Sequence, residues 1–346
     1  MKAAVLKEIE DLEIKDVSYP DFSSEEILIK IKACSICGTD IRVYHHGHKH
    51  MRFPRIIGHE LSGEIIEVGE RVKDYEIGEK VAIAPAIPCG KCYYCRRGMQ
   101  SMCINLTAIG YHYDGGFAEF MRVPENAVRN GCVNPIPSNL SFEEAALAEP
   151  FACAINGQEL SQIGLGDVVV VMGAGPLGCI HLQLAKVKGA SKTILIELSQ
   201  KRIEFARKFF SPDIVINPSL EDAIQRVKDE TEGRGADKII VACPSNKAQE
   251  DSLLMVAPRG IINFFGGLPL DKPFIKFNSN LVHYGEFYIV GTHGSAPYHN
   301  ELALNLISQG KVKIKELISH HLPLEGLEEG LHLAESGKGM KIMINP

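Results

Sequence analysis

The sequence of 346 residues contains no apolar run approaching the roughly 20 residues that a membrane-spanning helix needs. Its first residues alternate apolar and charged side chains, so they contain no continuous apolar core of a secretory signal peptide. It also has no internal repeat and no basic stripe, and its net charge is −6 with both signs interleaved. We therefore expect a cytoplasmic protein whose partner is a small, uncharged or mildly polar molecule. We expect it to bind neither nucleic acid nor a membrane.

The length predicts two domains, and 45% apolar with 23% charged residues is typical of a globular protein. Up to about residue 150, short segments alternate apolar and polar side chains with period two, as at 25–36 and 60–69. Glycine and proline separate these segments. The pattern alone predicts an all-β barrel or sandwich there.

After Glu149–Pro150 the pattern changes to strands alternating with helices. Asp167 is followed by a continuous valine-rich run, as expected of a strand buried on both faces. Further strands and helices follow in turn, and Phe287–Gly291 is the last strand of the series. This alternation predicts a parallel, doubly wound sheet, and the chain as a whole belongs to the α/β class.

A glycine-rich turn joins the valine-rich strand to the next predicted helix. Gly173 permits the tight turn, Gly175 lets a pyrophosphate approach the backbone, and Gly178 lets helix pack on strand. Glu197 ends the second strand of this region, where an acid hydrogen-bonds ribose hydroxyls and repels a 2′-phosphate. The motif predicts NAD rather than NADP; the alternative is a structural turn with a surface glutamate.

Four of the ten cysteines lie close together in a loop-like stretch, at Cys89, Cys92, Cys95 and Cys103. Four thiolates at this spacing form the closed tetrahedral shell of a structural zinc site, which does no chemistry. Iron–sulfur ligation and four unrelated thiols are the alternatives. Isolated cysteines such as Cys179 and Cys243 are interpreted as core residues.

A second metal site is indicated by dispersed residues: Cys37, the pair His59–Glu60, and Glu149 before Pro150. Each alone is more often an ordinary core or surface group. Together they offer a thiolate, an imidazole and carboxylate oxygens to a zinc ion with an open or exchangeable position. Such a site lets an alcohol oxygen reach the metal and lose its proton near neutral pH.

With these motifs, the sequence resembles the zinc-containing medium-chain dehydrogenase/reductase family from end to end. The resemblance covers CSICGTD, GHELSGEIIEVG, the four-cysteine lobe, DGGFAEF, the EPF stretch, GAGPLG and the C-terminal EGLEEG. Within the family it resembles the branch of sorbitol and other polyol, threonine and galactitol-phosphate dehydrogenases. That branch has glutamate directly after the zinc-binding histidine, as Glu60 follows His59 here.

The resemblance implies a role for each matching residue. Cys37, His59 and Glu60 would bind catalytic zinc, Glu149 would be an exchangeable fourth ligand or a polar contact for water and substrate, and Thr39 would take the alcohol proton. The remaining matches would contact the dinucleotide, and they are Gly173, Gly175, Leu177, Gly178, Glu197, Arg202, Gly266–Leu268 and Gly291–His293.

The resemblance also implies a domain organisation. A GroES-like, β-rich catalytic domain would comprise 1–152, with a zinc lobe at about 86–106, and would be completed by 288–346. A Rossmann NAD-binding domain would comprise 153–287, and the site would lie in the cleft between the two. A homotetramer is implied, with a homodimer as the alternative.

One position departs from the family pattern. Arg42 stands where polyol and threonine dehydrogenases commonly have histidine, near the outer end of the proton relay, and an arginine cannot act as a base there. Either water completes the relay, or Arg42 binds an anion, or it is a surface residue. The nearby histidines are read as an exposed loop, with substrate binding as the alternative, and they are His45, His46, His48 and His50.

We therefore expect a zinc-dependent, NAD-linked dehydrogenase with two zinc ions per chain that oxidises a secondary alcohol of a polyol or sugar-derived substrate to a ketone. Within the same family, a sugar-phosphate, sugar-acid or L-threonine dehydrogenase is the alternative. A non-catalytic nicotinamide sensor is the rival from another class.

Overall fold

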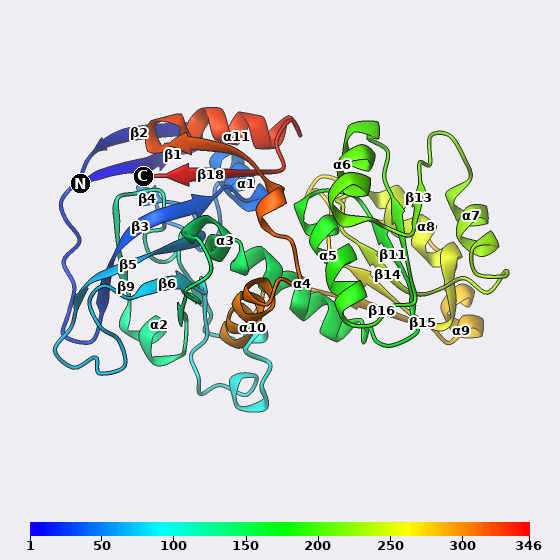
Figure 1. Cartoon of the computed structure of the whole chain (residues 1–346), viewed down its shortest axis with the longest axis horizontal. Helices are drawn as coiled ribbons and strands as arrows, with labels where there is room; N and C mark the ends of the chain where they lie inside the picture. The colour runs from blue at the N-terminus through cyan, green and yellow to red at the C-terminus, as the bar shows by residue number, and fades with distance from the viewer. The chain divides into compact units, whose positions relative to one another are not determined.

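The chain leaves its first unit and returns to it, as the computed structural model of residues 1–346 shows (Figure 1). Unit 1 comprises Met1–Ala152, Gly294–Gly310 and Ile314–Pro346. Unit 2 comprises Cys153–His293 and Lys311–Lys313. None of the helices has the length and apolar character that a membrane-spanning segment requires.

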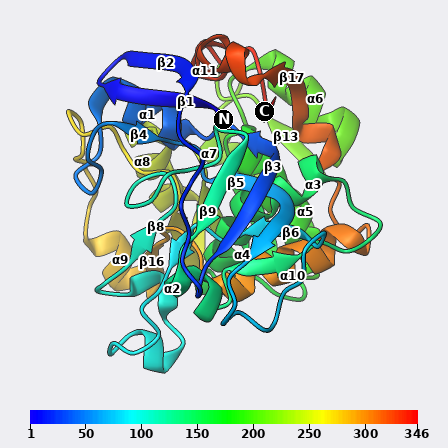
Figure 2. The same cartoon turned by 90° about the vertical axis from the view of Figure 1, so that its left-hand side faces the viewer.

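Unit 1 is rich in β-structure, with short helices between the strands (Figure 2). Its strands are β1 (Lys2–Glu8), β2 (Asp11–Asp16), β3 (Ile27–Ser35), β4 (Arg55–Ile56), β5 (Glu60–Val68), β6 (Lys80–Ile83), β7 (Ala86–Ile87), β8 (Thr107–Ala108), β9 (Phe120–Val123), β10 (Val133–Pro135), β17 (Ile318–Pro323) and β18 (Lys341–Asn345). Its helices are α1 (Gly38–His46), α2 (Glu125–Arg129), α3 (Phe142–Ala146), α10 (Pro297–Ser308) and α11 (Leu327–Glu335), with α4 (Ala148–Leu160) continuing into unit 2 and short 3₁₀ turns η1 (Cys95–Arg97), η2 (Gln100–Met102), η3 (Lys315–Leu317) and η4 (Leu324–Gly326).

The main sheet of unit 1 combines the two ends of the chain. Its strand order is β10-β6-β5-β3-β18-β17, with β9 also paired to β3, and β2-β1-β4 form a separate sheet. The last strand pairs antiparallel with β3, so that Met343 lies opposite Ser35 and Ile344 opposite Cys34. The alternating pattern of β3 buries its apolar side chains in a core that also contains Leu6 and Phe117. The C-terminal segment therefore completes a sheet begun near the N-terminus.

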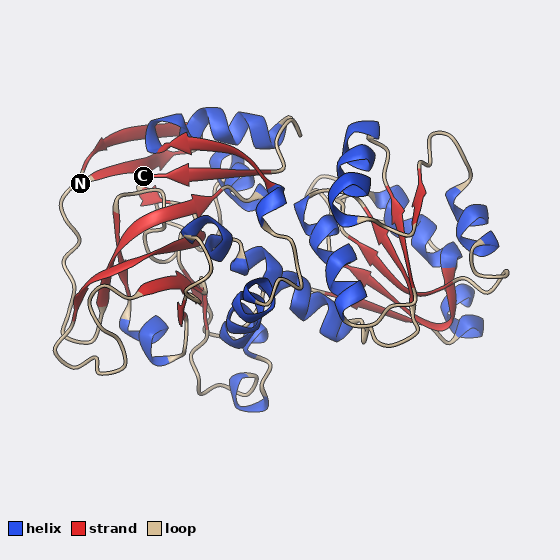
Figure 3. Ribbon diagram, in the orientation of Figure 1, coloured by secondary structure: helices blue, strands red, loops and turns tan.

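Unit 2 is a parallel sheet covered by helices on both faces (Figure 3). The strand order β13-β12-β11-β14-β15-β16 corresponds to third, second, first, fourth, fifth and sixth along the chain, which is the doubly wound order. The strands are β11 (Val168–Met172), β12 (Lys192–Ile196), β13 (Ile214–Ile216), β14 (Ala236–Val241), β15 (Val256–Phe264) and β16 (Tyr288–Gly291), and the helices are α5 (Pro176–Val187), α6 (Gln200–Phe210), α7 (Ala223–Asp229), α8 (Asn246–Met255) and α9 (Asn280–Gly285).

The strand order of unit 2 reverses between β11 and β14, and this fixes where a ligand can bind. All five residues of β11 are buried, as the unbroken valine-rich run predicts for a central parallel strand. In doubly wound sheets, ligands bind beyond the carboxyl ends of the strands at the point of reversal. The loop that leaves β11 there is the glycine-rich turn. The predicted α/β class is confirmed, but unit 1 is β-rich rather than all-β, because α1, α3 and α4 interrupt its strands.

Candidate metal centres and dinucleotide site

Three predicted zinc ligands come together in unit 1. Cys37 is the N-cap residue of α1, His59 precedes β5, and Glu60 is the first residue of β5. One ligand atom from each lies within 4.8 Å of the others. His59 is 7% exposed and Glu60 is fully buried. Two unpaired buried polar side chains would be unfavourable, so this clustering needs compensating partners.

Asp40 connects two of these residues. Its Oδ2 accepts a hydrogen bond from the backbone N–H of Cys37 at 2.9 Å, as the third residue of a capping box does. Its Oδ1 lies 3.2 Å from Nδ1 of His59. A carboxylate behind a histidine is the usual support of a metal-ligating imidazole, because it fixes the ring orientation. Asp40 was not among the predicted site residues, although the short Cys-Gly-Thr-Asp motif places it one helical turn from Cys37.

Lys341 is the partner of Glu60. Its Nζ donates to both carboxylate oxygens of Glu60 at 2.5 Å and to the carbonyl of Ile36 at 3.3 Å. Burial disfavours the lysine cation, but Glu60, Cys37 and Glu149 together raise the pKa of Lys341 above its ordinary value. The charge of Lys341 is thereby kept beside the candidate metal ligand. No sequence motif pointed to Lys341.

The surroundings of His59 also favour positive charge. Burial opposes the imidazolium, but Tyr111, Asp40 and Cys37 together raise the pKa of His59 well above its ordinary value. Burial first, and then the neighbouring acidic groups, raise the pKa of Tyr111. A cation between Cys37 and His59 is what such an acidic, desolvated environment favours.

The other two predicted residues lie at the edge of this group. Thr39 Oγ1 lies 3.6 Å from the Cys37 sulfur, and both side chains are half-buried. Glu149, the second residue of α4, is half-buried and is outside the set of three whose ligand atoms lie within 4.8 Å of one another. Its charge nevertheless raises the pKa values of Tyr111 and Lys341.

These donors fit a zinc ion. One thiolate, one imidazole and one carboxylate are the ligand types of catalytic zinc, and three protein ligands leave a fourth position for water or substrate. Asp40 supplies the outer support that such a site requires.

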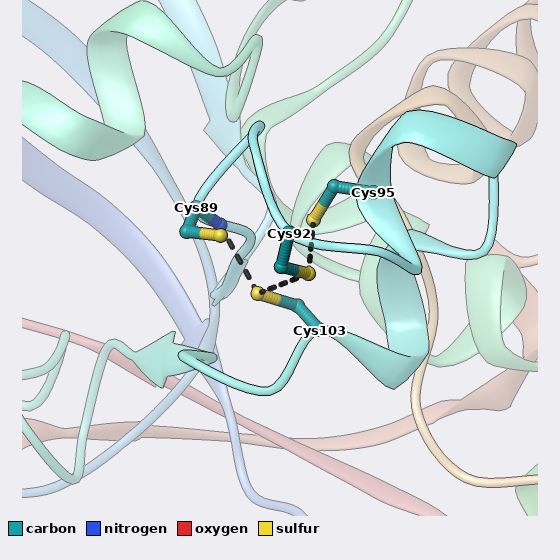
Figure 4. A group of neighbouring side chains, drawn as sticks. All are labelled: Cys89, Cys92, Cys95 and Cys103. Atoms are coloured by element: carbon teal, nitrogen blue, oxygen red, sulfur yellow. Dashed lines mark hydrogen bonds between the residues drawn. The ribbon is translucent and has the colours of Figure 1, made fainter.

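The four-cysteine lobe forms a second cluster (Figure 4). Sulfur atoms lie 3.5 Å apart for Cys92 and Cys95 and 3.9 Å apart for Cys92 and Cys103. Four sulfurs at about 2.3 Å from a tetrahedral zinc are separated by about 3.8 Å, whereas a disulfide requires about 2.05 Å. The separations therefore fit a zinc tetrahedron and no disulfide.

Backbone donors surround these thiols. The N–H of Cys95, with other backbone N–H groups, lowers the pKa of Cys92 to about 6. Burial and hydrogen bonds from neighbouring thiols raise the pKa of Cys95 to about 12. The four sulfurs therefore cannot all ionise without a compensating cation, which a divalent metal supplies.

The glycine-rich turn of unit 2 has three different reasons for its glycines. Gly173 adopts φ +104°, which disfavours any side chain. A Cβ on Gly178 would lie 1.9 Å from the Gly173 carbonyl oxygen. A Cβ on Gly175, the N-cap residue of α5, would meet open space. Backbone conformation explains Gly173 and packing explains Gly178, whereas the open space beside Gly175 at the N-terminus of a twelve-residue helix is suited to a pyrophosphate.

Glu197 lies beside this turn. Its Oε2 accepts the N–H of Ala174 at 2.6 Å and its Oε1 accepts the N–H of Ser199 at 2.8 Å. The carboxylate follows β12 directly and is 9% exposed. It is thus held at the carboxyl edge of the sheet, with lone pairs remaining for ribose hydroxyls.

The other residues assigned to the dinucleotide lie at or near the same edge. Leu177 is in the first turn of α5 and Arg202 in the first turn of α6. Gly266 follows β15, and its amide N–H donates to Val241 at 2.8 Å. The half-buried Leu268 comes two residues later, Gly291 ends β16, and the exposed His293 follows it.

Each of the two units overlaps a match to a known protein family. Residues 23–134 match the family described as alcohol dehydrogenase GroES-like domain, and residues 176–309 match zinc-binding dehydrogenase. L-threonine 3-dehydrogenase of Pyrococcus furiosus is 36% identical over 96% of this chain and 94% of its own length. Sorbitol dehydrogenase of Bacillus subtilis is 31% identical over 100% and 97%, respectively.

Solved structures share the whole fold. A zinc-binding dehydrogenase of Sinorhizobium meliloti bound to NADP superimposes with a TM-score of 0.92 at 28% identity, covering 100% of this chain and 99% of that chain. An alcohol dehydrogenase of Escherichia coli CFT073 complexed with NADH has a TM-score of 0.89 at 28% identity and the same coverage. The chain therefore belongs to the zinc-containing medium-chain dehydrogenase/reductase family and is an oxidoreductase of the zinc-type alcohol dehydrogenase class.

Proposed function

We propose that this chain is an NAD-linked zinc dehydrogenase that oxidises a secondary alcohol of a polyol or sugar-derived substrate to a ketone. The observation that carries the proposal is the grouping of Cys37, His59 and Glu60 within 4.8 Å. Unit 1 supplies the metal ligands and the proton-handling group, and unit 2 supplies the dinucleotide cradle. Relatives of comparable length named as sorbitol and threonine dehydrogenases support a secondary alcohol as substrate.

A zinc ion held by Cys37, His59 and Glu60 supplies Lewis-acid polarisation of the substrate hydroxyl. Asp40 orients the imidazole of His59, and Lys341 holds the Glu60 carboxylate. The Thr39 hydroxyl, 3.6 Å from the Cys37 sulfur, accepts the substrate's hydroxyl proton and passes its own to solvent. The dinucleotide that the glycine-rich turn and Glu197 would hold would supply the hydride acceptor.

Glu197 supports NAD as the cofactor in preference to NADP. Its carboxylate is fixed by Ala174 and Ser199, so it cannot swing away from a 2′-phosphate without losing two hydrogen bonds. Repulsion between the two anions disfavours NADP. Solved relatives contain either dinucleotide, so the fold alone does not select between them.

We also propose a homotetramer in the cytoplasm. Tyr288 on the edge strand β16 is 62% exposed, and Ile104 of the four-cysteine lobe is 69% exposed. An open sheet edge and exposed apolar side chains support pairing with further copies of the chain. Light scattering coupled to size exclusion measures the mass; a monomer would overturn this assignment.

A panel of alcohols tests the proposal. Zinc-loaded protein is mixed with NAD and neutral polyols, polyol phosphates, sugar acids and threonine, and NADH formation is followed. Cys37→Ser is expected to abolish turnover while keeping NADH binding and the zinc equivalent of the four-cysteine lobe. Wild-type turnover in Cys37→Ser would remove the metal mechanism.

Thr39 is tested separately with a conservative pair. Thr39→Ser keeps the hydroxyl and is expected to retain most activity, whereas Thr39→Val should lower kcat by about 100-fold or more with little change in KM. Equal kcat in the two variants would exclude Thr39 as the proton acceptor.

The alternative to a neutral polyol dehydrogenase within the same family is a sugar-phosphate, sugar-acid or L-threonine dehydrogenase. These share the metal ligands and the dinucleotide cradle and differ in whether the substrate carries an anionic group. A cluster of cationic side chains beside Tyr111 favours an anionic substrate.

A further inference from the structure

A hollow of about 380 Å³ opens on the surface of unit 1, within the size range of small-ligand pockets. Its wall comes from the loop between α1 and β4 and from the turn after β8. We call it the basic pocket, and the lining residues that define it are Lys49, His50, Arg52, Arg55, Tyr111 and His112.

The basic pocket carries positive charge without matching acids. Arg55 is paired, because its guanidinium bonds Asp114 at 2.8 Å. Lys49 and Arg52 form no ion pair, and no acidic side chain lines the pocket. This excess stands out in a chain of net charge −6. Two uncompensated cations in a concave surface favour an anionic ligand.

Histidine side chains add hydrogen-bond donors. Nδ1 of His112 accepts the backbone N–H of Ala108 at 3.1 Å, so a neutral His112 carries its proton on Nε2. Burial, and then the neighbouring His50 and Arg55, lower the pKa of His112. His112 is therefore a neutral N–H donor near pH 7, and the fixed charge comes from the lysine and arginines.

The basic pocket adjoins the candidate catalytic metal site. Tyr111 lines the pocket, and its ring centroid lies 5.8 Å from that of His59. The same ring lies 4.7 Å from His48, whose ring is 5.4 Å from His50 of the pocket wall. The ring of Tyr111 therefore lies between the pocket and His59, a candidate zinc ligand.

We propose that the basic pocket binds a phosphate or carboxylate group carried by the alcohol substrate. The proposal rests on the proposed dehydrogenase function and narrows it to an anionic polyol or sugar derivative. Lysine and arginine are suited to this task because a guanidinium pairs with an oxyanion through two parallel hydrogen bonds. Burial first, and then His50, Lys49, His112 and Arg42, lower the pKa of His48, so the exposed Arg42 of α1 adds to the positive field.

The test is a charge-removing double variant, Lys49→Gln with Arg52→Gln. Arg207→Gln with Lys315→Gln removes the same charge from two exposed, unpaired side chains outside the pocket and is the matched control. Steady-state kinetics are measured for a neutral polyol, the corresponding polyol phosphate and the corresponding sugar acid. The control variant is expected to behave as wild type with all three.

The wild-type protein is expected to prefer one of the anionic substrates. The pocket variant should lower the ratio of kcat/KM for that substrate over the neutral polyol by about 10- to 100-fold, mainly through KM. The phosphate and carboxylate arms identify which anion is bound. A wild-type preference for the neutral polyol, or an unchanged ratio in the pocket variant, would overturn the proposal.

A binding experiment separates failure of this inference from failure of the dehydrogenase assignment. Inorganic phosphate is titrated calorimetrically into zinc-loaded protein with saturating NADH, which fills the dinucleotide cradle. The pocket variant should bind phosphate at least about 10-fold more weakly than wild type and the control. If the pocket variant binds phosphate more weakly but wild type oxidises no alcohol of the panel, only the dehydrogenase assignment is refuted. Equal phosphate affinity in wild type, control and pocket variant would refute the basic pocket as an anion site.

Discussion

Lys341 Nζ lies 2.5 Å from both carboxylate oxygens of Glu60, although the two residues are separated by 281 positions in the chain. Their side chains are 6% and 0% exposed. The pair joins β18, the last strand of the chain, to β5 at the residue directly after His59. The buried carboxylate of Glu60, a candidate metal ligand, is therefore held by the buried ammonium of Lys341.

Lys341→Met is expected to destabilise the protein, because it leaves the Glu60 carboxylate buried without a partner. Breaking one side of a buried ion pair typically costs about 3–5 kcal/mol. Zinc can replace part of the missing charge, so the cost should be larger in chelator-treated protein than in zinc-loaded protein. Urea unfolding of both forms measures it, with exposed Lys315→Met as the control. An equal loss with and without zinc would contradict a metal beside Glu60.

Asp40→Asn tests whether Asp40 supports the candidate zinc ligands Cys37 and His59. The amide cannot hold the His59 ring and the Cys37 backbone as the carboxylate does, so affinity for one zinc equivalent should fall by about 10- to 100-fold. Competition with a chelator measures both equivalents per chain. The exposed Asp74→Asn serves as the control. Unchanged affinity for both zinc equivalents would show that Asp40 does not support the metal site.

Local sequence was sufficient for the parts of the site formed by neighbouring residues. The spacing from Cys89 to Cys103 predicted a metal lobe, and their sulfurs do form a cluster. The order of strands and helices after Pro150 predicted the parallel sheet, because each element carries its own periodicity.

The remaining contacts depend on tertiary structure. Lys341 reaches Glu60 only because β18 pairs with β3, and a lone lysine in an apolar C-terminal strand gives no signal of that contact. Tyr111 meets His59 across two loops, so no spacing rule connects them. Periodicity also misses the return of the chain to unit 1, which required the family resemblance.

Substitutions at two glycines of the glycine-rich turn distinguish a packing role from a role in dinucleotide binding. Gly178→Ala places a Cβ against the Gly173 carbonyl and should cost about 3 kcal/mol of stability. Gly175→Ala meets open space and should cost less than about 1 kcal/mol, while weakening NADH binding at least about 10-fold by obstructing the pyrophosphate. Thermal unfolding and NADH fluorescence titration measure the two effects. Unchanged NADH affinity in Gly175→Ala would refute the assigned cradle.

His181 predicts a pH dependence of stability. Burial on α5 lowers the pKa of His181 to about 3, and its ring packs edge-on against Phe265. Since the unfolded chain takes up this proton near pH 6.5 and the folded chain does not, the folded state loses stability as pH falls from about 6.5 towards 3. The slope is about 1.4 kcal/mol per pH unit.

The comparison with His181→Met isolates this contribution. Urea unfolding at several pH values between 4 and 7 measures the free energy of unfolding of wild type and variant. As the pH falls, wild type should lose about 1.4 kcal/mol per pH unit relative to His181→Met. Parallel curves would show that the folded and the unfolded chain take up this proton equally, and would contradict the lowered pKa of His181.

Metal removal tests the central claim most directly. The best alcohol of the panel is assayed with NAD before and after a chelator removes both zinc equivalents, and again after zinc is restored. NADH formation should fall to background when the Cys37–His59–Glu60 equivalent is lost and return with zinc but not with magnesium, whose preferred ligands are oxygens. Full turnover by metal-free protein would contradict a zinc-dependent dehydrogenase.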